Sequence, residues 1–403
     1  MKVALNTLGC KLNQAETERL ARQFLEAGHC LVHHETSADV FILNTCTVTS
    51  TADGKARRWL RLVHRRNPGA RLVVTGCYAQ RKPEELARIE GVSLVVGNNE
   101  KPYLLRLLQD TGYPGSLASA VGYSSVLRTR TFINIQDGCS RTCAYCIVPR
   151  VRGQEKSQPA ADVVAEVRKR VDEGYQEVVL TGTEIGAYHG GLNLTGLLGR
   201  ILIETSVPRL RLSSLQPQEI STELLELWRD SRLCPHFHLS LQSGSDRVLQ
   251  RMRRGYSPAD YKRIVRLIRD MVPDAAITTD IIVGFPGETE EEFAGSFDSC
   301  RKLQFARIHV FPYSPRPDTE ASRMPGQISV KVKGERRRKM LALAEQSADD
   351  FQKRFLGKVM SVLWETKSDG IWSGFTSNYI RAYTKSDDDL TNKILAVELV
   401  KFT

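Results

Sequence analysis

The feature that most constrains this chain is a short loop in which three cysteines follow one another at the spacing CxxxCxxC. Cys139, Cys143 and Cys146 stand in this loop, with Tyr145 just before the last one. Sulfur atoms at this spacing can converge on one face of an iron–sulfur cube and leave one iron open to another ligand. A structural zinc site would need a fourth Cys or His nearby, and the next histidine is the distant His189. Buried structural cysteines are the remaining interpretation.

Length and charge narrow the class of protein. A chain of 403 residues is expected to form two or three domains. No apolar run reaches the roughly 18 residues of a membrane span. Nine cysteines without a secretion signal predict a cytoplasmic protein with metal sites rather than disulfides. The net charge of +11 predicts a nucleic-acid partner, because basic clusters at 55–66, 247–254 and 331–339 suit phosphates; solvated helix faces are the alternative.

Residues 1–108 are predicted to form an open parallel α/β sheet. Short β-rich runs alternate with helical stretches. The expected strands lie at 3–5, 40–43, 72–74 and 92–96, and the expected helices include 16–26 and 55–66. Cys10, Cys46 and Cys77 each follow one of the first three strands. Because open α/β sheets build ligand sites at the carboxyl ends of strands, these thiols are a second candidate metal site. Small apolar roles at strand ends are the alternative.

The remaining cysteines lack such a placement and are expected to be core or incidental thiols: Cys30, Cys234 and Cys300. The cysteine loop itself resembles the hallmark of the radical S-adenosylmethionine (radical SAM) enzymes, in which an aromatic residue stands at the position of Tyr145. The resemblance implies a [4Fe–4S] cluster on the loop cysteines. It also implies that S-adenosylmethionine is chelated at the open iron and cleaved to a 5′-deoxyadenosyl radical.

A three-cysteine α/β domain joined to such a loop is similar to the methylthiotransferases. That resemblance implies a second [4Fe–4S] cluster on Cys10, Cys46 and Cys77, implicated in supplying sulfur. The segments 8–16 and 75–80 resemble the subgroup that acts on N6-threonylcarbamoyladenosine, next to the anticodon of transfer RNA.

After a turn-rich linker at 109–128, repeated strand–helix units over 129–350 predict a barrel-like parallel sheet. The resemblance specifies a partial (βα)6 radical SAM barrel. Active-site residues are expected at the carboxyl ends of its strands. The residues that match the family's cofactor-binding positions are Tyr145, Gly182, Thr183, Glu184, Arg211, Ser214, Gln242 and Ser243. Gln216 stands where the family often has glutamate, which weakens a carboxylate contact there.

The last barrel strand leads into a rigid loop at 311–320, in which Asp318 replaces a commoner glycine. Tyr313 and Arg316 of this loop are expected either to contact RNA or to serve the fold. Over 355–403, short alternating strands predict a small antiparallel β-barrel, a shape that presents strands and loops to oligonucleotides. The segment resembles the TRAM module, and its candidate RNA-binding residues are Trp372, Asn378 and Arg381.

The resemblance implies an enzyme that converts N6-threonylcarbamoyladenosine at position 37 of transfer RNA to its 2-methylthio form. No acid–base residue is predicted, because C2 of adenine is an unactivated carbon. The expected partners are the anticodon stem-loop of transfer RNA, a reducing electron-donor protein and a sulfur donor. Alternatives are the same chemistry on isopentenyladenosine in transfer RNA or on a ribosomal-protein aspartate, and a non-catalytic RNA-binding protein with structural metal.

Overall fold

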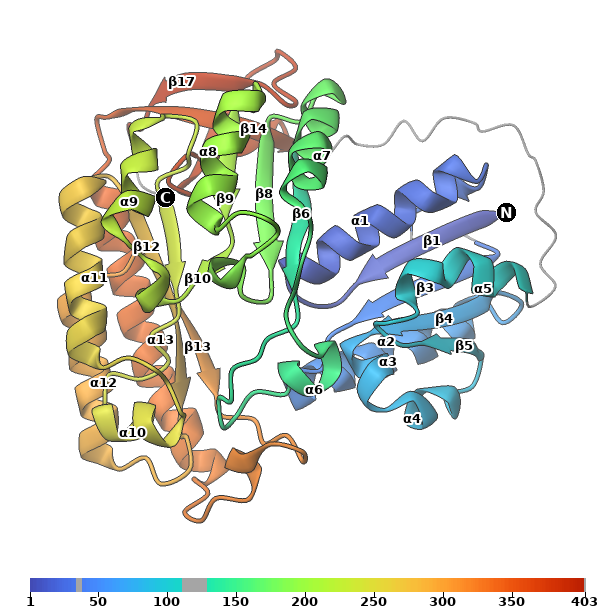
Figure 1. The fold of residues 1–403 in the computed structure, drawn as a ribbon, viewed down its shortest axis with the longest axis horizontal. Coiled ribbons are helices and arrows are strands. Elements are labelled where there is room, and N and C mark those ends of the chain that lie inside the picture. Colours follow the sequence, from blue (N-terminus) through green and yellow to red (C-terminus); the bar gives the residue numbers. More distant parts are fainter. Residues whose placement is uncertain (34–37, 111–128, 402–403) are drawn as a thin grey trace.

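The computed structural model describes residues 1–33, 38–110 and 129–401. Three parts follow one another along the chain (Figure 1): an N-terminal α/β unit, a central set of curled parallel sheets flanked by helices, and a C-terminal antiparallel sheet. The expected linker at 109–128 lies outside the described residues, apart from the two that end helix α5 (Leu104–Asp110). Among the described residues, no helix is long and apolar enough to cross a membrane.

The N-terminal unit is a five-stranded parallel sheet with the order β2-β1-β3-β4-β5. Its strands are β1 (Lys2–Thr7), β2 (Cys30–Leu31), β3 (Val40–Thr45), β4 (Arg71–Gly76) and β5 (Val92–Val96). Its other helices are α1 (Lys11–Glu26), α2 (Ser50–Arg66), α3 (Cys77–Arg81) and α4 (Pro83–Ala87). Two apolar clusters pack against this sheet, as a buried parallel sheet requires. The predicted alternation is confirmed, but α1 begins at Lys11 rather than at residue 16.

Two four-stranded sheets form the centre of the molecule, with the orders β7-β6-β8-β9 and β10-β11-β12-β13. Their strands are β6 (Arg130–Asp137), β7 (Lys156–Ser157), β8 (Glu177–Gly182), β9 (Arg209–Leu212), β10 (Ser214–Leu215), β11 (His236–Leu239), β12 (Ala276–Val283) and β13 (Arg307–Pro312). All pair in parallel except β7, and a bridge between Leu210 and Leu233 carries the pairing from one sheet towards the other. The predicted parallel α/β organisation is therefore confirmed.

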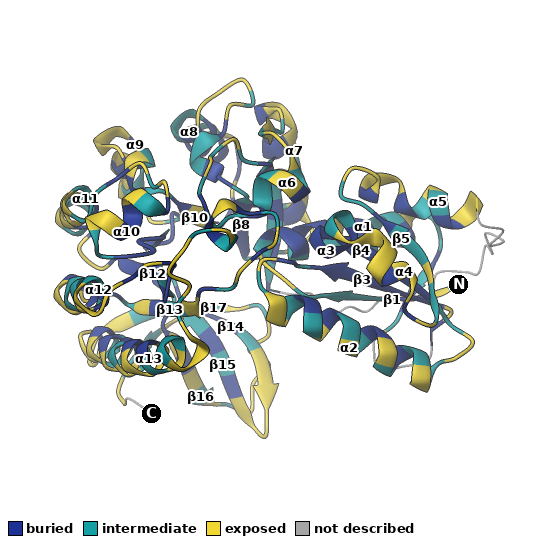
Figure 2. Cartoon of the chain, turned by 90° about the horizontal axis from the view of Figure 1, so that it is seen from below, coloured by how far each residue is buried: buried dark blue, intermediate teal, exposed yellow. Residues whose placement is uncertain are grey.

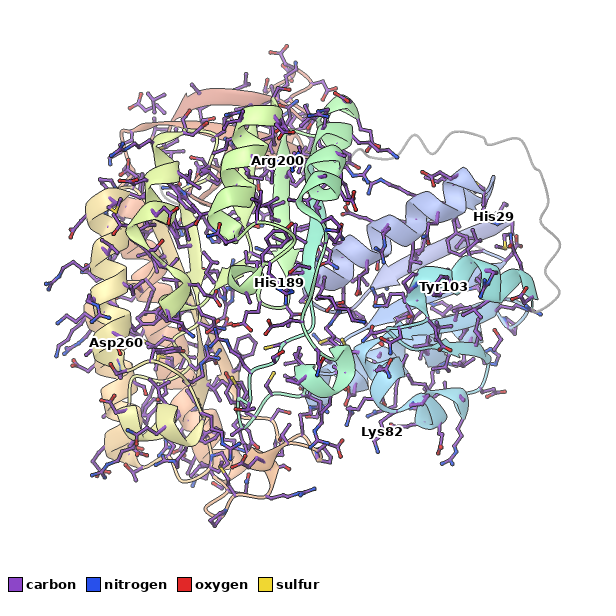
Figure 3. All side chains as sticks on the ribbon, viewed as in Figure 1. His29, Lys82, Tyr103, His189, Arg200 and Asp260 are labelled. Atoms are coloured by element: carbon purple, nitrogen blue, oxygen red, sulfur yellow. The ribbon has the colours of Figure 1, made fainter. Side chains whose placement is uncertain are left out.

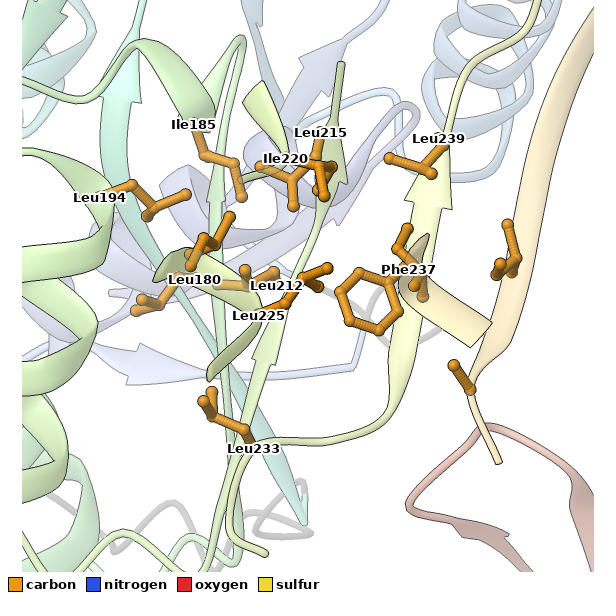
Figure 4. Close-up of a cluster of buried hydrophobic side chains, with 14 of the residues drawn as sticks. Leu180, Ile185, Leu194, Leu212, Leu215, Ile220, Leu225, Leu233, Phe237 and Leu239 are labelled. Atoms are coloured by element: carbon orange, nitrogen blue, oxygen red, sulfur yellow. The ribbon is translucent and has the colours of Figure 1, made fainter. Parts of the chain in front are cut away.

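Helices connect these strands and cover one face of the curve (Figure 1). They are α6 (Val148–Arg152), α7 (Ala160–Asp172), α8 (Leu194–Glu204), α9 (Thr222–Glu226), α10 (Asp246–Arg251), α11 (Pro258–Met271) and α12 (Glu290–Leu303). Side chains alternate along each strand, and the set that faces the helices is apolar. Leu180, Leu212 and Phe237 belong to this packed layer (Figure 4).

The opposite, inner face of the curved sheets is polar and charged. On β11, for example, Phe237 and Leu239 pack outward, so His236 and His238 face inward. The same alternation turns charged or polar side chains inward on the other strands: Arg130, Glu177, Arg209, Arg211, Asp280 and His309. The inside of the curve is therefore a polar wall rather than a second apolar core.

Helix α13 (Val330–Lys353) leads to an antiparallel sheet with the order β16-β15-β14-β17. Its strands are β14 (Val359–Ser368), β15 (Ile371–Thr376), β16 (Arg381–Lys385) and β17 (Ile394–Glu398). Trp364 and Trp372 contribute to its apolar cluster. Arg209, the first residue of β9, donates to the carbonyl oxygens of Phe375 at 3.0 Å and Ser361 at 2.6 Å. The C-terminal sheet thus lies against the amino ends of the central strands.

A buried ion-pair group fastens the N-terminal unit to the central part. Asp53 on α2 lies 2.7 Å from both Arg81 Nη2 and Arg316 Nη1, and all three side chains are almost wholly buried. Arg316 follows β13, so this contact crosses between the two parts of the chain. The outer side of α2, by contrast, faces solvent (Figure 2).

Replacing Asp53 by asparagine should destabilise the protein, because Arg81 and Arg316 would remain buried without their carboxylate. Removing one partner of a buried ion pair typically costs about 3–5 kcal/mol. Urea unfolding measures this loss. The control is Glu84→Gln, which removes a pair with Arg88 whose side chains are 88% and 82% exposed and should leave the unfolding midpoint unchanged. Equal midpoints for the two variants would contradict the fastening role.

Candidate functional site

Three thiols of the N-terminal unit meet at one edge of its sheet. Cys10 is the N-cap residue of α1, Cys46 follows β3, and Cys77 opens α3. Each pair among them is close enough to interact electrostatically, so the structure brings together the residues that the sequence predicts. We call them the N-terminal trio. The turn into Cys77 depends on Gly76, whose φ is +96° and whose added Cβ would overlap the carbonyl oxygen of Thr45.

The second group of thiols lies in the loop between β6 and α6. Cys139, Cys143 and Cys146 form this loop trio. The sulfur atoms of Cys139 and Cys146 accept hydrogen bonds from backbone N–H groups at 3.4 Å, and the Cys143 sulfur accepts one from Arg254 Nη1, also at 3.4 Å. Donors of this kind stabilise negative charge on sulfur, which suits thiolates that hold an iron–sulfur cluster.

The spacing of the sulfur atoms favours a cluster over a single metal ion. Four-coordinate zinc with bonds of ~2.3 Å would bring its sulfur ligands to about 3.8 Å from one another. Among the described residues, neither trio brings all three sulfur atoms within 4.8 Å of one another. His189, labelled in Figure 3, lies with Nδ1 3.0 Å from the Ala187 carbonyl oxygen and 3.3 Å from Ser157 Oγ, and so does not close a zinc site.

Burial keeps several of these thiols protonated when no metal is bound. It raises the pKa of Cys46 and of Cys139 to about 12 and that of Cys146 to about 11. A cluster requires thiolates, so its assembly must release protons. The two sets of neighbouring thiols fit [4Fe–4S] clusters in the chemistry of their ligand atoms.

Helix α6 makes the two trios neighbours. It begins two residues after Cys146 and packs on α3, where Ile147 and Val151 form one apolar cluster with Cys77. Asn98 donates to the carbonyl oxygen of Val151 at 2.7 Å and to the Cys77 sulfur at 3.8 Å. The segment that follows the loop trio therefore forms part of the wall of the N-terminal trio.

Arg152, the last residue of α6, is a buried cation between the two sites. Its guanidinium donates to Asn13 at 3.0 Å, to Glu16 at 2.9 Å and to Asp137 at 2.9 Å. It also interacts electrostatically with all three thiols of the N-terminal trio. Burial alone would raise the pKa of Glu16, but Lys101 and Arg152 lower it to about 2. A permanently charged group thus favours thiolates at the N-terminal trio.

Predicted cofactor-binding residues gather beside the loop trio. Glu184 accepts a hydrogen bond from Cys139 Sγ at 3.1 Å and pairs with Arg141, which also lies 3.2 Å from Glu219 Oε1. Burial opposes ionisation of Glu184, but the hydrogen bond and charge of Arg141 lower its pKa below the usual value. Burial and the neighbouring Glu184 raise the pKa of Glu219. Gly182 precedes this group, and an added Cβ there would lie 2.5 Å from the Gln136 carbonyl oxygen.

Five other predicted residues lie near carboxyl-terminal strand ends or beside the cysteine loop. Gln242 adopts a left-handed φ of +66°, and the buried Ser243 hydroxyl lies 3.0 Å from Ser296 Oγ. Thr183 donates to Asp137 at 3.1 Å. The other two are Tyr145, whose ring packs edge-on against Phe285, and the exposed Ser214 of β10.

Arg211 does not join this group. It is buried, donates to the carboxylate of Glu177 at 2.7 and 2.9 Å, and donates to the Ser377 carbonyl oxygen at 2.9 Å. Its guanidinium also lies 4.5 Å from the centre of the Tyr379 ring. These contacts hold the C-terminal sheet against the central strands, so the predicted contact with the cofactor is replaced by a structural role.

The candidate RNA-binding residues divide into buried and exposed side chains. Four are buried: Tyr313, Arg316, Trp372 and Asn378. Arg381 is exposed and lies beside the rings of Phe375 and Tyr383, the latter also exposed. A buried ring offers no face to an RNA base. Within the C-terminal sheet, the neighbouring exposed side chains Arg381 and Tyr383 are available to RNA, and no sequence motif pointed to Tyr383.

Other charged residues of the site also escaped the sequence analysis. Lys11 and Arg152 stand near cysteines in the sequence, and this proximity was a usable signal. Arg254 lies 111 residues from Cys143, and only the fold brings them together. The same holds for a group on the inner face, where ligand atoms of His238, Asp280 and His309 lie within 4.8 Å of one another.

Two family models match the chain. The model described as Radical SAM superfamily matches residues 133–300, and the one described as Uncharacterized protein family UPF0004 matches residues 2–97. The first range contains the loop trio and the second the N-terminal trio. The radical SAM methyltransferase TsrM from Kitasatospora setae, solved with tryptophan and a SAM analogue, has a similar fold. Its TM-score is 0.57 at 17% identity, over 78% of this chain and 74% of that chain.

Curled parallel sheets with a three-cysteine loop after β6 thus define a radical SAM protein. Proteins of similar sequence identify a narrower family within this class. The threonylcarbamoyladenosine tRNA methylthiotransferase of Bacillus subtilis is 36% identical, over 99% of this chain and 94% of the relative. That of Aquifex aeolicus is 38% identical, over 90% and 92%. A tRNA-2-methylthio-N(6)-dimethylallyladenosine synthase of Endomicrobium trichonymphae is 32% identical, over 99% and 97%.

The chain belongs to the radical SAM methylthiotransferase family. Membership makes it an enzyme and implies that it uses S-adenosylmethionine and a [4Fe–4S] cluster. The sequence-based assignment to this family is confirmed.

Gly76→Ala should disturb the N-terminal trio, because the new Cβ would push on the Thr45 carbonyl next to Cys46 and strain the residue before Cys77. The expected cost is about 2–4 kcal/mol in urea unfolding, with reduced iron uptake on anaerobic reconstitution. The matched control is Gly69→Ala, where no atom lies within 4 Å of the added Cβ. Iron uptake and stability equal to those of the control would contradict the role of the Gly76 turn.

Proposed function

We propose that this enzyme installs a methylthio group at C2 of N6-threonylcarbamoyladenosine, at position 37 of transfer RNA. Relatives named for that nucleoside are 34–38% identical to this chain, and relatives named for dimethylallyladenosine are 32–35% identical. The observation that carries the proposal is the adjacency of two sulfur trios, because the reaction needs one centre that starts radical chemistry and one that supplies sulfur.

Each trio is proposed to hold one [4Fe–4S] cluster, the loop trio with an iron open to the amino and carboxylate groups of S-adenosylmethionine. Bound there, the cluster supplies the electron that cleaves the sulfonium. The chain itself contributes fixed charge. Arg254 beside Cys143, and Arg152 beside the N-terminal trio, offset the negative charge of the thiolates.

The S-adenosylmethionine pocket is proposed beside the loop trio, at the carboxyl ends of β8, β10 and β11. Gly182, Thr183 and Glu184 are proposed to bind the amino group, because Glu184 lies beside Cys139 and Arg141 lowers the pKa of its carboxyl group. The other proposed lining residues are Tyr145, Ser214, Gln242 and Ser243. Arg211 is left out because Glu177 already occupies its guanidinium.

The finer architecture is also a proposal. Residues 129–350 would form a partial (βα)6 barrel and residues 355–403 a TRAM-like barrel, with 1–108 as the methylthiotransferase domain and 109–128 as the linker. Two surfaces suit the anticodon stem-loop of a transfer RNA. One is the exposed pair Arg381 and Tyr383. The other is a pocket in which Arg57, Arg61, Arg65 and Arg88 outnumber the two acidic residues Glu85 and Glu90.

The proposed reaction also needs partners: a reducing electron-donor protein and a sulfur donor. Thiols that must stay reduced and a transfer RNA substrate suit the cytoplasm. No acid–base residue is assigned, because the reacting carbon is activated by radical chemistry rather than by proton transfer.

Deleting the gene should remove 2-methylthio-N6-threonylcarbamoyladenosine from transfer RNA and leave N6-threonylcarbamoyladenosine in its place. Mass spectrometry of nucleoside digests measures both, and the methylthiolated isopentenyl nucleoside serves as the internal control. Loss of that isopentenyl product instead would assign the alternative nucleoside. A change confined to a ribosomal-protein aspartate would assign the protein-modifying alternative.

Anaerobically reconstituted protein should contain about eight irons, and replacing either trio by alanine should leave about four. Iron and sulfide analysis measures this. Cys30→Ala is the control, because Cys30 is a free cysteine of β2 outside both trios, and should retain all the iron. A protein that takes up zinc, or a trio whose removal costs no iron, would contradict the two-cluster assignment.

A further inference from the structure

Lys11 projects from the first turn of α1 into the space enclosed by the central strands. Its side chain interacts electrostatically with Arg130, Glu177 and Arg211, which stand on β6, β8 and β9. It also interacts with His236 and His309, which stand on β11 and β13. Because Lys11 interacts with residues on five strands, its ammonium lies on the inner side of the curved sheets.

The other cations on this wall already have carboxylates. Arg211 lies 2.7 Å from Glu177, and Arg130 lies 2.7 Å from Glu365. Both carboxylates are thus engaged by guanidinium groups, which bind carboxylates more specifically than an ammonium does. Neither Glu177 nor Glu365 is therefore free to pair with a further cation.

Glu177 attracts the Lys11 ammonium, but that carboxylate is already paired with Arg211. The Lys11 Nζ lies 5.9 Å from the centre of the Tyr379 ring, and no ion pair or hydrogen bond to Nζ occurs within the described residues. The carboxylate of Asp280, also on the inner wall, is bonded to Ser240 at 3.1 Å and lies 3.2 Å from His238 Nε2. A half-buried ammonium with no carboxylate of its own suits a negatively charged ligand in the same space.

We propose that Lys11 binds the carboxylate of the threonylcarbamoyl group of the substrate nucleoside. This inference rests on the proposed function and names the contact that selects the nucleoside. A threonylcarbamoyl group carries a carboxylate, whereas a dimethylallyl group is uncharged and apolar. An ammonium within reach of the bound nucleoside would attract the first group and gain nothing from the second. Because Lys11 adjoins Cys10, this contact would anchor the nucleoside beside the N-terminal trio.

The test compares the full-length, cluster-loaded protein with a Lys11→Gln variant in binding two anticodon stem-loops. One carries N6-threonylcarbamoyladenosine and the other carries the methyl ester of the same group. Fluorescence anisotropy under anaerobic conditions gives the ratio of the two dissociation constants. Wild-type protein should prefer the free carboxylate by on the order of 10–100-fold. In Lys11→Gln this ratio should fall to about one.

Two further variants serve as controls. Lys11→Arg keeps the charge and should retain most of the preference, which a merely structural role for Lys11 does not predict. Lys82→Gln changes an exposed lysine of the N-terminal unit, labelled in Figure 3, and should retain the full ratio. Iron analysis of each variant checks that the clusters are loaded.

The outcomes separate the inference from the function on which it rests. A wild-type preference for the carboxylate that survives in Lys11→Gln overturns the role of Lys11 but leaves the proposed function in place. Equal binding of both stem-loops by wild-type protein, together with methylthiolation of isopentenyladenosine, overturns both. Equal binding together with turnover of N6-threonylcarbamoyladenosine overturns the inference alone.

Discussion

The arrangement of this enzyme depends on Arg152 and the groups that hold it. The guanidinium is buried between Asn13, Glu16 and Asp137, so it ties α1 of the N-terminal unit to the end of β6. A buried cation is stable only when such partners surround it. Because Arg152 ends the helix that follows the loop trio, the same contacts fix the position of that loop relative to the N-terminal thiols. The same contacts thus bring two groups of thiols from separate parts of the chain close together.

The two faces of the central sheets differ in polarity, and this difference shapes the interior of the molecule. The outer face packs on helices and supplies the apolar core, which leaves the inner face free to be polar. Charged side chains on that face pair with one another where they can, as in Arg211 with Glu177. The C-terminal sheet rests on the same network through Ser377 and Phe375. The inner face of the central sheets is thus lined by groups that can bind polar ligands.

Much of the fold, and the approach of the cysteines to one another, was predictable from the sequence for local reasons. Cys139, Cys143 and Cys146 lie within eight residues, so their convergence needs only one loop. The N-terminal trio was predictable too, because consecutive strands of a parallel sheet end at the same edge. The burial of individual side chains was not predictable. Trp372 and Asn378 are residue types that often contact RNA, but both are buried in the C-terminal sheet.

The sequence by itself determined the order of strands and helices, the two sets of cysteines and the family. These features follow from the spacing of the cysteines and the periodicity of the apolar residues. The tertiary structure alone decided which distant groups share a space. Arg254 reaches Cys143, Arg316 meets Asp53 instead of RNA, and Lys11 enters the curve of the central strands. These contacts join residues far apart in the chain, and their positions follow from packing, which no local pattern records.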